Sequence, residues 1–229
     1  MPAVDSLSPP AIVFDLDGTL VDTAPDLHAT LNVVLEDLGC AGVSLEQVRA
    51  MVGDGVRALL ERGLRAGGMV LHEAAMTAAT AHYLRHYGTN LARSSRPFPG
   101  VTVALDALAD RGFRLAVCTN KPHALSLALL EALGLLARFD AVVGGDHLAM
   151  RKPDPGHLLG TLAAAGAKRE GSVMVGDSRN DVAVARAAGL PVVLVSFGYT
   201  AVPARALGAD AIIDDFAELA VAIGKVLAA

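Results

Sequence analysis

Two aspartates lie two residues apart, directly after an apolar run near the start of the chain. The segment AIVFDLDGT spans residues 11–19 and contains Asp15 and Asp17. On a strand, side chains at i and i+2 share one face. The two carboxylates would therefore repel each other unless a divalent cation or a phosphoryl group lay between them. Alone, the Asp-Gly pair at 17–18 is also typical of a turn.

A second polar motif follows another apolar run, in the segment VCTNKP at residues 117–122. Thr119 supplies a hydroxyl and Asn120 an amide just before an expected helix. Main-chain N–H groups at a helix N-terminus, with such donors beside them, can bind a phosphate group. The alternative is that these two residues only cap the helix.

Two more motifs lie farther along the chain. Lys152 precedes Pro153, so its backbone is expected to be extended, and its ammonium could balance phosphate and carboxylate charge. Asp177 ends an apolar run, and Asp181 follows four residues later as a helix begins. Carboxylates at a strand end suit Mg²⁺, whereas the spacing does not fit an EF-hand calcium loop.

The elements that must position these residues alternate between strand and helix. Apolar runs predict strands at 11–17, 114–120, 139–144, 172–177, 192–197 and 211–213. Helical patterns lie at 102–111, 122–133, 155–165, 180–188 and 216–227. This alternation predicts an α/β fold with a Rossmann-like parallel sheet. All four motifs then lie at or after strand ends, where such sheets bind ligands.

One stretch, between Asp22 and Pro97, interrupts the alternation. It contains several helical patterns, broken near residues 39, 53–55 and 67–68, and no convincing strand. So long a helical stretch exceeds a single crossover connection, which needs roughly a dozen residues. We therefore expect an α/β core formed by residues 1–22 and 96–229, with an inserted helical cap at residues 23–95.

The composition limits the class of protein. Apolar residues make up 53% of the 229 residues, enough for a large core, and the net charge is −5. No apolar run reaches the roughly 18 residues of a membrane span, and residues 1–10 lack the features of a secretory signal. With only Cys40 and Cys118, we expect a cytoplasmic protein of a reducing compartment. We expect a small phosphorylated substrate and neither nucleic acid nor membrane as partner; a monomer and a homodimer both stay open.

In this order, the motifs resemble those of the haloacid dehalogenase-like hydrolase superfamily, and the insertion resembles its helical type of cap. Within it, the chain is most similar to the phosphoglycolate phosphatase family, through the strings FDLDGTLVDTAPDL, MVGDGVRALLERGL, CTNKP, GGDHLAMRKPDPGHLL, VGDSRNDV and FGY. The resemblance implies a Mg²⁺-dependent phosphatase of carbohydrate metabolism. Its reaction would be the hydrolysis of 2-phosphoglycolate to glycolate and phosphate.

The resemblance also implies roles for individual residues. Asp15 would be the nucleophile that forms an aspartyl phosphate, and Asp17 the general acid and base. The phosphoryl oxygens would be held by Thr119, Asn120 and Lys152.

The same resemblance implies a magnesium site in the core. Mg²⁺ would be bound by the Asp15 carboxylate, the Asp17 main-chain carbonyl and Asp177. Asp181 would fix the water ligands of the ion.

Substrate choice is expected from the cap, at the glycines Gly53 and Gly55 and in the helix after them. Charged residues at 57, 61 and 65 recur every fourth position, which predicts an exposed row of ion pairs. Arg62 lies off that row and could face the glycines, where it would meet a small carboxylate of the substrate. A purely structural arginine is the alternative.

Two other functions fit the core motifs. A related phosphatase could act on a sugar phosphate, N-acetylmuramate 6-phosphate or pyrophosphate. A phosphomutase would need an acid or base in the cap. His28 lies one position from where the resemblance would require it, and one residue of helix turns a side chain by about 100°.

Overall fold

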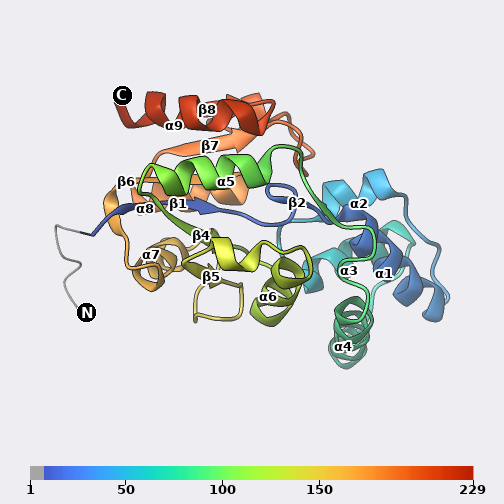
Figure 1. Cartoon of the computed structure of the whole chain (residues 1–229). Coiled ribbons are helices and arrows are strands. Elements are labelled where there is room, and N and C mark those ends of the chain that lie inside the picture. The colour runs from blue at the N-terminus through green and yellow to red at the C-terminus, as the bar shows by residue number, and fades with distance from the viewer. Residues whose placement is uncertain (1–7, 229) are drawn as a thin grey trace.

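A six-stranded parallel sheet forms the centre of the computed structural model, which describes residues 8–228 (Figure 1). The strand order is β5-β4-β1-β6-β7-β8. The bounds are β1 Pro10–Phe14, β4 Arg114–Cys118, β5 Ala141–Val143, β6 Lys168–Gly176, β7 Val192–Val195 and β8 Ala211–Ile213. The chain builds outward from β1 through β4 to β5, then returns to β6 beside β1. Crevices at such reversals of strand order are where open α/β sheets bind ligands.

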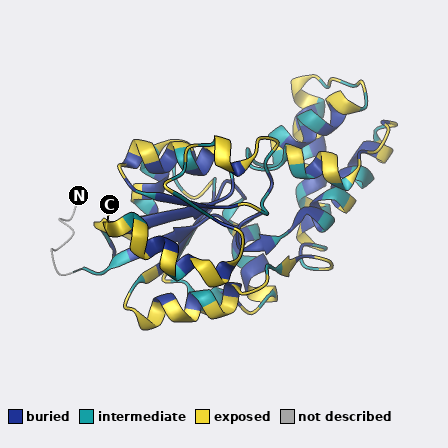
Figure 2. Cartoon of the chain, turned by 90° about the horizontal axis from the view of Figure 1, so that it is seen from above, coloured by how far each residue is buried: buried dark blue, intermediate teal, exposed yellow. Residues whose placement is uncertain are grey.

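Helices cover both faces of this sheet. They are α5 Val101–Asp110, α6 His123–Ala132, α7 Pro155–Ala164, α8 Arg179–Ala188 and α9 Leu219–Ala228. In β1, Ile12 and Phe14 pack in one cluster with residues of α5 and α9, whereas Ala11 and Val13 pack in another with residues of α7 and α8. Alternate strand residues thus reach opposite layers. Most residues of the central strands β4, β1, β6 and β7 are buried (Figure 2), and the expected α/β fold with a parallel sheet is confirmed.

Four helices lie between β2 (Val21–Asp22) and β3 (Arg96–Pro97), which form an antiparallel ribbon. They are α1 Ala24–Asp37, α2 Leu45–Met51, α3 Val56–Ala66 and α4 Glu73–Gly88. They pack on one another beyond one end of the sheet (Figure 1). We call this helical group the cap and the rest the core; the exact boundaries at 22/23 and 95/96 stay a prediction.

Several elements differ from the sequence-based expectation. The first strand ends at Phe14, because the main-chain N–H groups of Leu20 and Val21 donate to the Leu16 carbonyl and bend the chain into a turn. The β2–β3 ribbon was not expected. β6 begins at Lys168 rather than near Ser172. Short 3₁₀ turns occur at Leu136–Arg138, Ala204–Ala206 and Phe216–Glu218, the last just before α9.

Residues 1–7 and 229 lie outside the residues that the structure describes. Most of the segment 1–10, from which we expected no secretory signal, is therefore not described. Within residues 8–228, no helix is both long and apolar enough to cross a membrane.

Candidate active site

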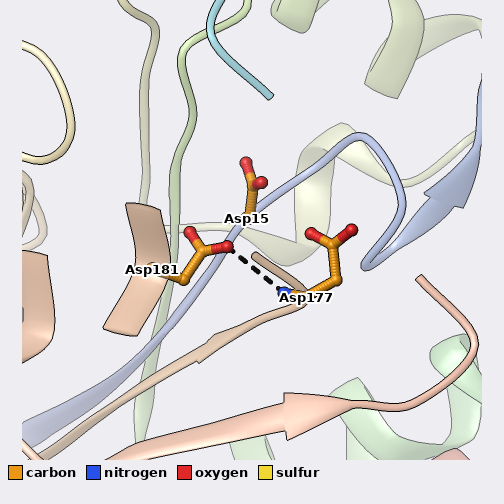
Figure 3. A group of neighbouring side chains, drawn as sticks. All are labelled: Asp15, Asp177 and Asp181. Atoms are coloured by element: carbon orange, nitrogen blue, oxygen red, sulfur yellow. Dashed lines mark hydrogen bonds between the residues drawn. The ribbon is translucent and has the colours of Figure 1, made fainter. Parts of the chain in front are cut away.

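Three buried carboxylates meet where β1 and β6 end. Asp15 directly follows β1, Asp177 directly follows β6, and Asp181 lies in the first turn of α8. One oxygen from each lies within 4.8 Å of the others, and Figure 3 shows the three side chains around one space. Among the residues that the structure describes, this is the one cluster of its kind. Adjacent parallel strands bring these aspartates together although 162 residues separate Asp15 from Asp177.

Asp181 is fixed by hydrogen bonds at the start of α8. Its Oδ2 accepts from the main-chain N–H groups of Asp177 (3.2 Å) and Ser178 (3.0 Å) and from the Ser178 hydroxyl (2.7 Å). Its Oδ1 accepts from Nζ of Lys152 at 2.7 Å. A carboxylate near a helix N-terminus also interacts favourably with the helix dipole. With both oxygens engaged, Asp181 suits a positioning role.

Lys152 is the cation within this cluster. Its Nζ lies 3.0 Å from Asp15 and 2.7 Å from Asp181, and its side chain is only 1% exposed. Burial opposes its charge, but Asp15 and Asp181 outweigh burial and raise the pKa of the Lys152 ammonium. The lysine expected to be fixed in the site is thus held by two carboxylates.

The negative charge of the three carboxylates exceeds the positive charge that Lys152 supplies. Burial raises the pKa of Asp15 to about 6, although Lys152 acts in the opposite direction. Burial, together with the charges of Asp181 and Asp15, raises the pKa of Asp177 well above its usual value. A divalent cation bound among these oxygens would reverse both effects. The donor set therefore fits a hard cation such as Mg²⁺.

Close packing shapes the Asp177 end of the cluster. Oδ1 of Asp177 accepts from the Thr19 hydroxyl at 3.2 Å, and Oδ2 accepts from the Tyr199 N–H at 2.5 Å. Gly18 has a φ of +86°, and a Cβ there would lie 2.6 Å from the Asp177 carboxylate. Only glycine therefore fits between Asp17 and Thr19.

Asp17 has surroundings different from those of Asp15. Its carboxylate is not part of the three-aspartate cluster but accepts from Nζ of Lys121 at 3.0 and 3.2 Å. The same ammonium donates to the Tyr87 hydroxyl at 2.8 Å. Asp17 lies beyond the end of β1, so the two acids do not share one strand face as the spacing predicted. A metal contact by its main-chain carbonyl stays a prediction.

Thr119 and Asn120 follow β4, which lies beside β1 on the side opposite β6. Thr119 is buried, and its hydroxyl accepts from the Lys121 N–H at 3.3 Å. The Asn120 side-chain amide donates to the carbonyls of Gly53 (3.0 Å) and Lys152 (3.2 Å). The Asn120 side chain thus contacts the cap, so its main-chain N–H is the donor left for a phosphate.

The cap reaches the core at the segment 53–55, which we call the tip. Asn180 donates to Oδ1 of Asp54 at 2.7 Å and to the Gly53 carbonyl at 3.2 Å. Arg62 lies beside the tip, where its guanidinium is bonded to Asp54 and to the Met51 carbonyl; a contact with the substrate stays a prediction. Arg62 stabilises the tip from the cap side.

A cavity lies between the tip, the cap helices and the ends of the strands. The core wall contains Asp15, Asp17, Thr119, Asn120 and Lys121, and the cap wall contains Leu27, Gly53, Gly55, Val56, Leu59 and Tyr87. The space open to the centre of a water molecule is about 40 Å³, and one water needs roughly 10–15 Å³. Among the described residues, Arg62 and His28 do not line it. The cavity suits a small substrate.

Sequence reasoning missed two cavity residues, Lys121 and Tyr87. Lys121 lies within the CTNKP motif, where it was given no role. Tyr87 is separated from it by 34 residues, and no local pattern signals their contact. Tyr199, within the FGY string, was likewise given no role, but its hydroxyl accepts from the Ala24 N–H at 2.9 Å and donates to Asp22 where the cap begins.

The family model described as haloacid dehalogenase-like hydrolase matches residues 12–195, a range that includes the carboxylate cluster, Lys152 and the residues that follow β4. The chain belongs to this family. It is 45% identical over 214 residues to a phosphoglycolate phosphatase of Agrobacterium fabrum, covering 93% of this chain and 92% of that one. It is 46% identical over 219 residues to a phosphoglycolate phosphatase of Caulobacter vibrioides, covering 96% and 92%.

The fold of this hydrolase has a close match among solved structures. The crystal structure of a predicted phosphoglycolate phosphatase from Haemophilus somnus superposes with a TM-score of 0.87 at 33% identity, covering 95% of this chain and 99% of that one. Together with the relatives above, it identifies this hydrolase as a phosphoric monoester hydrolase.

Proposed function

We propose that this hydrolase is a Mg²⁺-dependent phosphatase that converts 2-phosphoglycolate to glycolate and phosphate through an aspartyl-phosphate intermediate. The observation that carries the proposal is the cluster of Asp15, Asp177, Asp181 and Lys152 beside a small cavity. Curated relatives at 45–46% identity over more than nine-tenths of the chain carry the name phosphoglycolate phosphatase, which supports the substrate.

In the proposed reaction, Asp15 attacks phosphorus and the ester oxygen departs, so the phosphoryl group is transferred to an Asp15 oxygen. Asp17, on the same wall of the cavity, gives a proton to the departing oxygen and later takes one from the water that cleaves the aspartyl phosphate. Splitting hydrolysis into two displacements in this way is the usual benefit of covalent catalysis.

Charge stabilisation comes from the residues around the nucleophile. Lys152, the Thr119 hydroxyl and the Asn120 N–H would hold phosphoryl oxygens. Asp15, Asp177 and the Asp17 carbonyl would bind Mg²⁺, with Asp181 holding its waters in place. The ion would offset the combined negative charge of the carboxylates and the phosphate.

The cap would exclude water and set the size of the substrate. The small cavity favours a two-carbon acid over a sugar phosphate. A phosphomutase is disfavoured because His28 bonds to the Val43 carbonyl at 2.9 Å and, among the described residues, is not in the cavity wall. For the cytoplasmic location, the support is that Cys40 and Cys118 are free and buried.

The test is a turnover screen with Mg²⁺ over 2-phosphoglycolate, sugar phosphates, N-acetylmuramate 6-phosphate and pyrophosphate. We expect kcat/KM for 2-phosphoglycolate to exceed the others by at least about tenfold, about 1.4 kcal/mol. Rapid acid quench of Asp17→Asn should trap phosphate on the protein. A clear preference for another ester would overturn the substrate, and phosphate that never accumulates on the protein would overturn the two-step route.

A further inference from the structure

Lys121 is a buried cation to which the proposed chemistry assigns no role. Its side chain is 3% exposed, and Nζ contacts Asp17 at 3.0 Å and the Tyr87 hydroxyl at 2.8 Å. Nζ also lies 4.4 Å from the centre of the Tyr87 ring. Burying an ammonium is unfavourable unless charges and hydrogen bonds compensate for it. The protein therefore holds this charge at a defined point, between a core carboxylate and a cap tyrosine.

Lys121 also lines the cavity. Among the described residues that line the cavity, it alone carries a positive charge. The cap wall opposite it is largely apolar, with Leu27, Val56 and Leu59. Apart from the phosphoryl group, which the proposed chemistry places beside Lys152, an anionic group of the substrate meets no other cationic side chain among the described residues of the cavity wall.

The other basic residues of the region are directed elsewhere. Lys152 contacts Asp15 and Asp181, where the proposed chemistry uses it for the phosphoryl group. Arg62 is bonded to the tip. Arg151 lines a neighbouring depression, which shares Asn120 with the cavity. None of these three, all within the described part of the chain, lines the cavity.

The position of Lys121 matches a carboxylate close to the ester oxygen. Asp17 is proposed to protonate that oxygen, so the oxygen lies beside Asp17 during the reaction. In 2-phosphoglycolate the carboxylate carbon is two single bonds from the ester oxygen, each about 1.5 Å long. A cation in hydrogen-bond contact with Asp17 is therefore within reach of that carboxylate, whereas a cation farther along the cavity would suit a longer acid.

The geometry points to Lys121 as the residue that binds the substrate carboxylate, with the Tyr87 hydroxyl holding its ammonium in place. Lys121 thereby selects small phosphorylated acids over neutral phosphate esters. This assignment rests on the proposed function, and it gives Lys121 the role that the sequence pattern suggested for Arg62. A charge-assisted hydrogen bond in a buried site is strong enough to decide between two esters that differ only in this group.

The test compares 2-phosphoglycolate with ethyl phosphate, in which a methyl group replaces the carboxylate. The measured quantity is the ratio of the two kcat/KM values in the wild type, in Lys121→Met and in Lys225→Met, an exposed lysine of α9 replaced in the same way. Lys121→Met should lower the ratio by about 10- to 100-fold, and Lys225→Met should leave it within about twofold. If Lys121→Met does not fold, Lys121→Gln carries the same expectation.

A direct binding measurement separates recognition from catalysis. On an Asp15→Asn background, which cannot form the aspartyl phosphate, calorimetry measures the Kd of each ester with and without Lys121→Met. The added change should weaken 2-phosphoglycolate binding and spare ethyl phosphate.

The outcomes distinguish this assignment from the proposed function. Equal losses on both esters would mean that Lys121 serves only as the partner of Asp17, and the assignment would be overturned. A wild type without preference for 2-phosphoglycolate would overturn the proposed substrate before any variant is compared. A preference that survives Lys121→Met would overturn the assignment of Lys121 alone.

Discussion

Replacing Lys152 with methionine should strongly destabilise the metal-free protein. Its ammonium contacts both Asp15 and Asp181, at 3.0 and 2.7 Å, from a side chain that is 1% exposed. Removing one partner of a buried ion pair costs about 3–5 kcal/mol. For a chain of this length each kcal/mol lowers Tm by roughly 2–4 °C, so the expected fall in Tm is roughly 6–20 °C.

The loss should depend on pH in a defined direction. Burial already raises the pKa of Asp15 to about 6 and the pKa of Asp177 well above its usual value, and Lys152 opposes both shifts. Without Lys152 both pKa values rise more. Because they lie above the unfolded value of about 3.9, the folded variant binds protons more tightly than the unfolded chain and regains stability as pH falls through this range. The difference in Tm should therefore be smaller near about pH 5 than near about pH 8.

Thermal unfolding in EDTA, followed by calorimetry, measures both effects. Lys225→Met is the matched control, because it removes an exposed lysine by the same substitution. Its Tm should stay within about 2 °C of the wild type. A Tm for Lys152→Met within the same margin, or a loss that grows as pH falls, would refute the reasoning about this buried charge.

Three further predictions concern the nucleophile, the metal and the tip. Asp15→Asn should lower kcat by several powers of ten. The Tm of the metal-free protein should stay unchanged or rise, because the substitution removes one of three crowded carboxylates. A kcat above about a hundredth of the wild-type value would contradict the assignment of Asp15 as the nucleophile. Mg²⁺ should restore activity after EDTA treatment. The affinity of the protein for Mg²⁺, measured by calorimetry, should fall by about tenfold or more per pH unit below pH 6, because protons compete for Asp15, whose pKa is about 6. An affinity independent of pH would contradict metal binding at Asp15. Asn180→Ala should lower kcat/KM by about tenfold or more, because it removes a hydrogen bond to the charged Asp54. Arg179 also forms an ion pair with Asp54, at 3.7 Å from an exposed side chain, so Arg179→Ala should lower kcat/KM by less than about fivefold. Equal effects of the two substitutions would show that the contact of the tip with the core does not depend on Asn180.

The alternation of strands and helices was predictable because parallel strands buried on both faces are written as short apolar runs. That alternation also predicted that Asp15 and Asp177 would meet, since the carboxyl ends of parallel strands lie on one edge of the sheet. Asp181 joins them because a helix that starts after the strand turns its first carboxylate back toward the strand end. These relations depend on the backbone alone.

Relations between side chains from distant segments were not predictable. Periodicity placed Arg62 toward the tip, but it could not show that Asp54 and the Met51 carbonyl would engage its guanidinium. Nor could it show that Tyr87 of α4 contacts Lys121, because that contact depends on how the cap rests on the core. The end of β1 was also misplaced, because the turn at Leu16 depends on hydrogen bonds that an apolar run does not reveal.

The early end of β1 has a consequence for the two acids of the first motif. Were the strand to continue to Asp17, both carboxylates would share one face and compete for the same cation. Instead, the turn separates them: Asp15 contacts Lys152, and Asp17 contacts Lys121. Each acid thus has its own lysine, supplied by a different loop at the edge of the sheet. Two residues apart in sequence, they gain the separate surroundings that a nucleophile and a proton donor need.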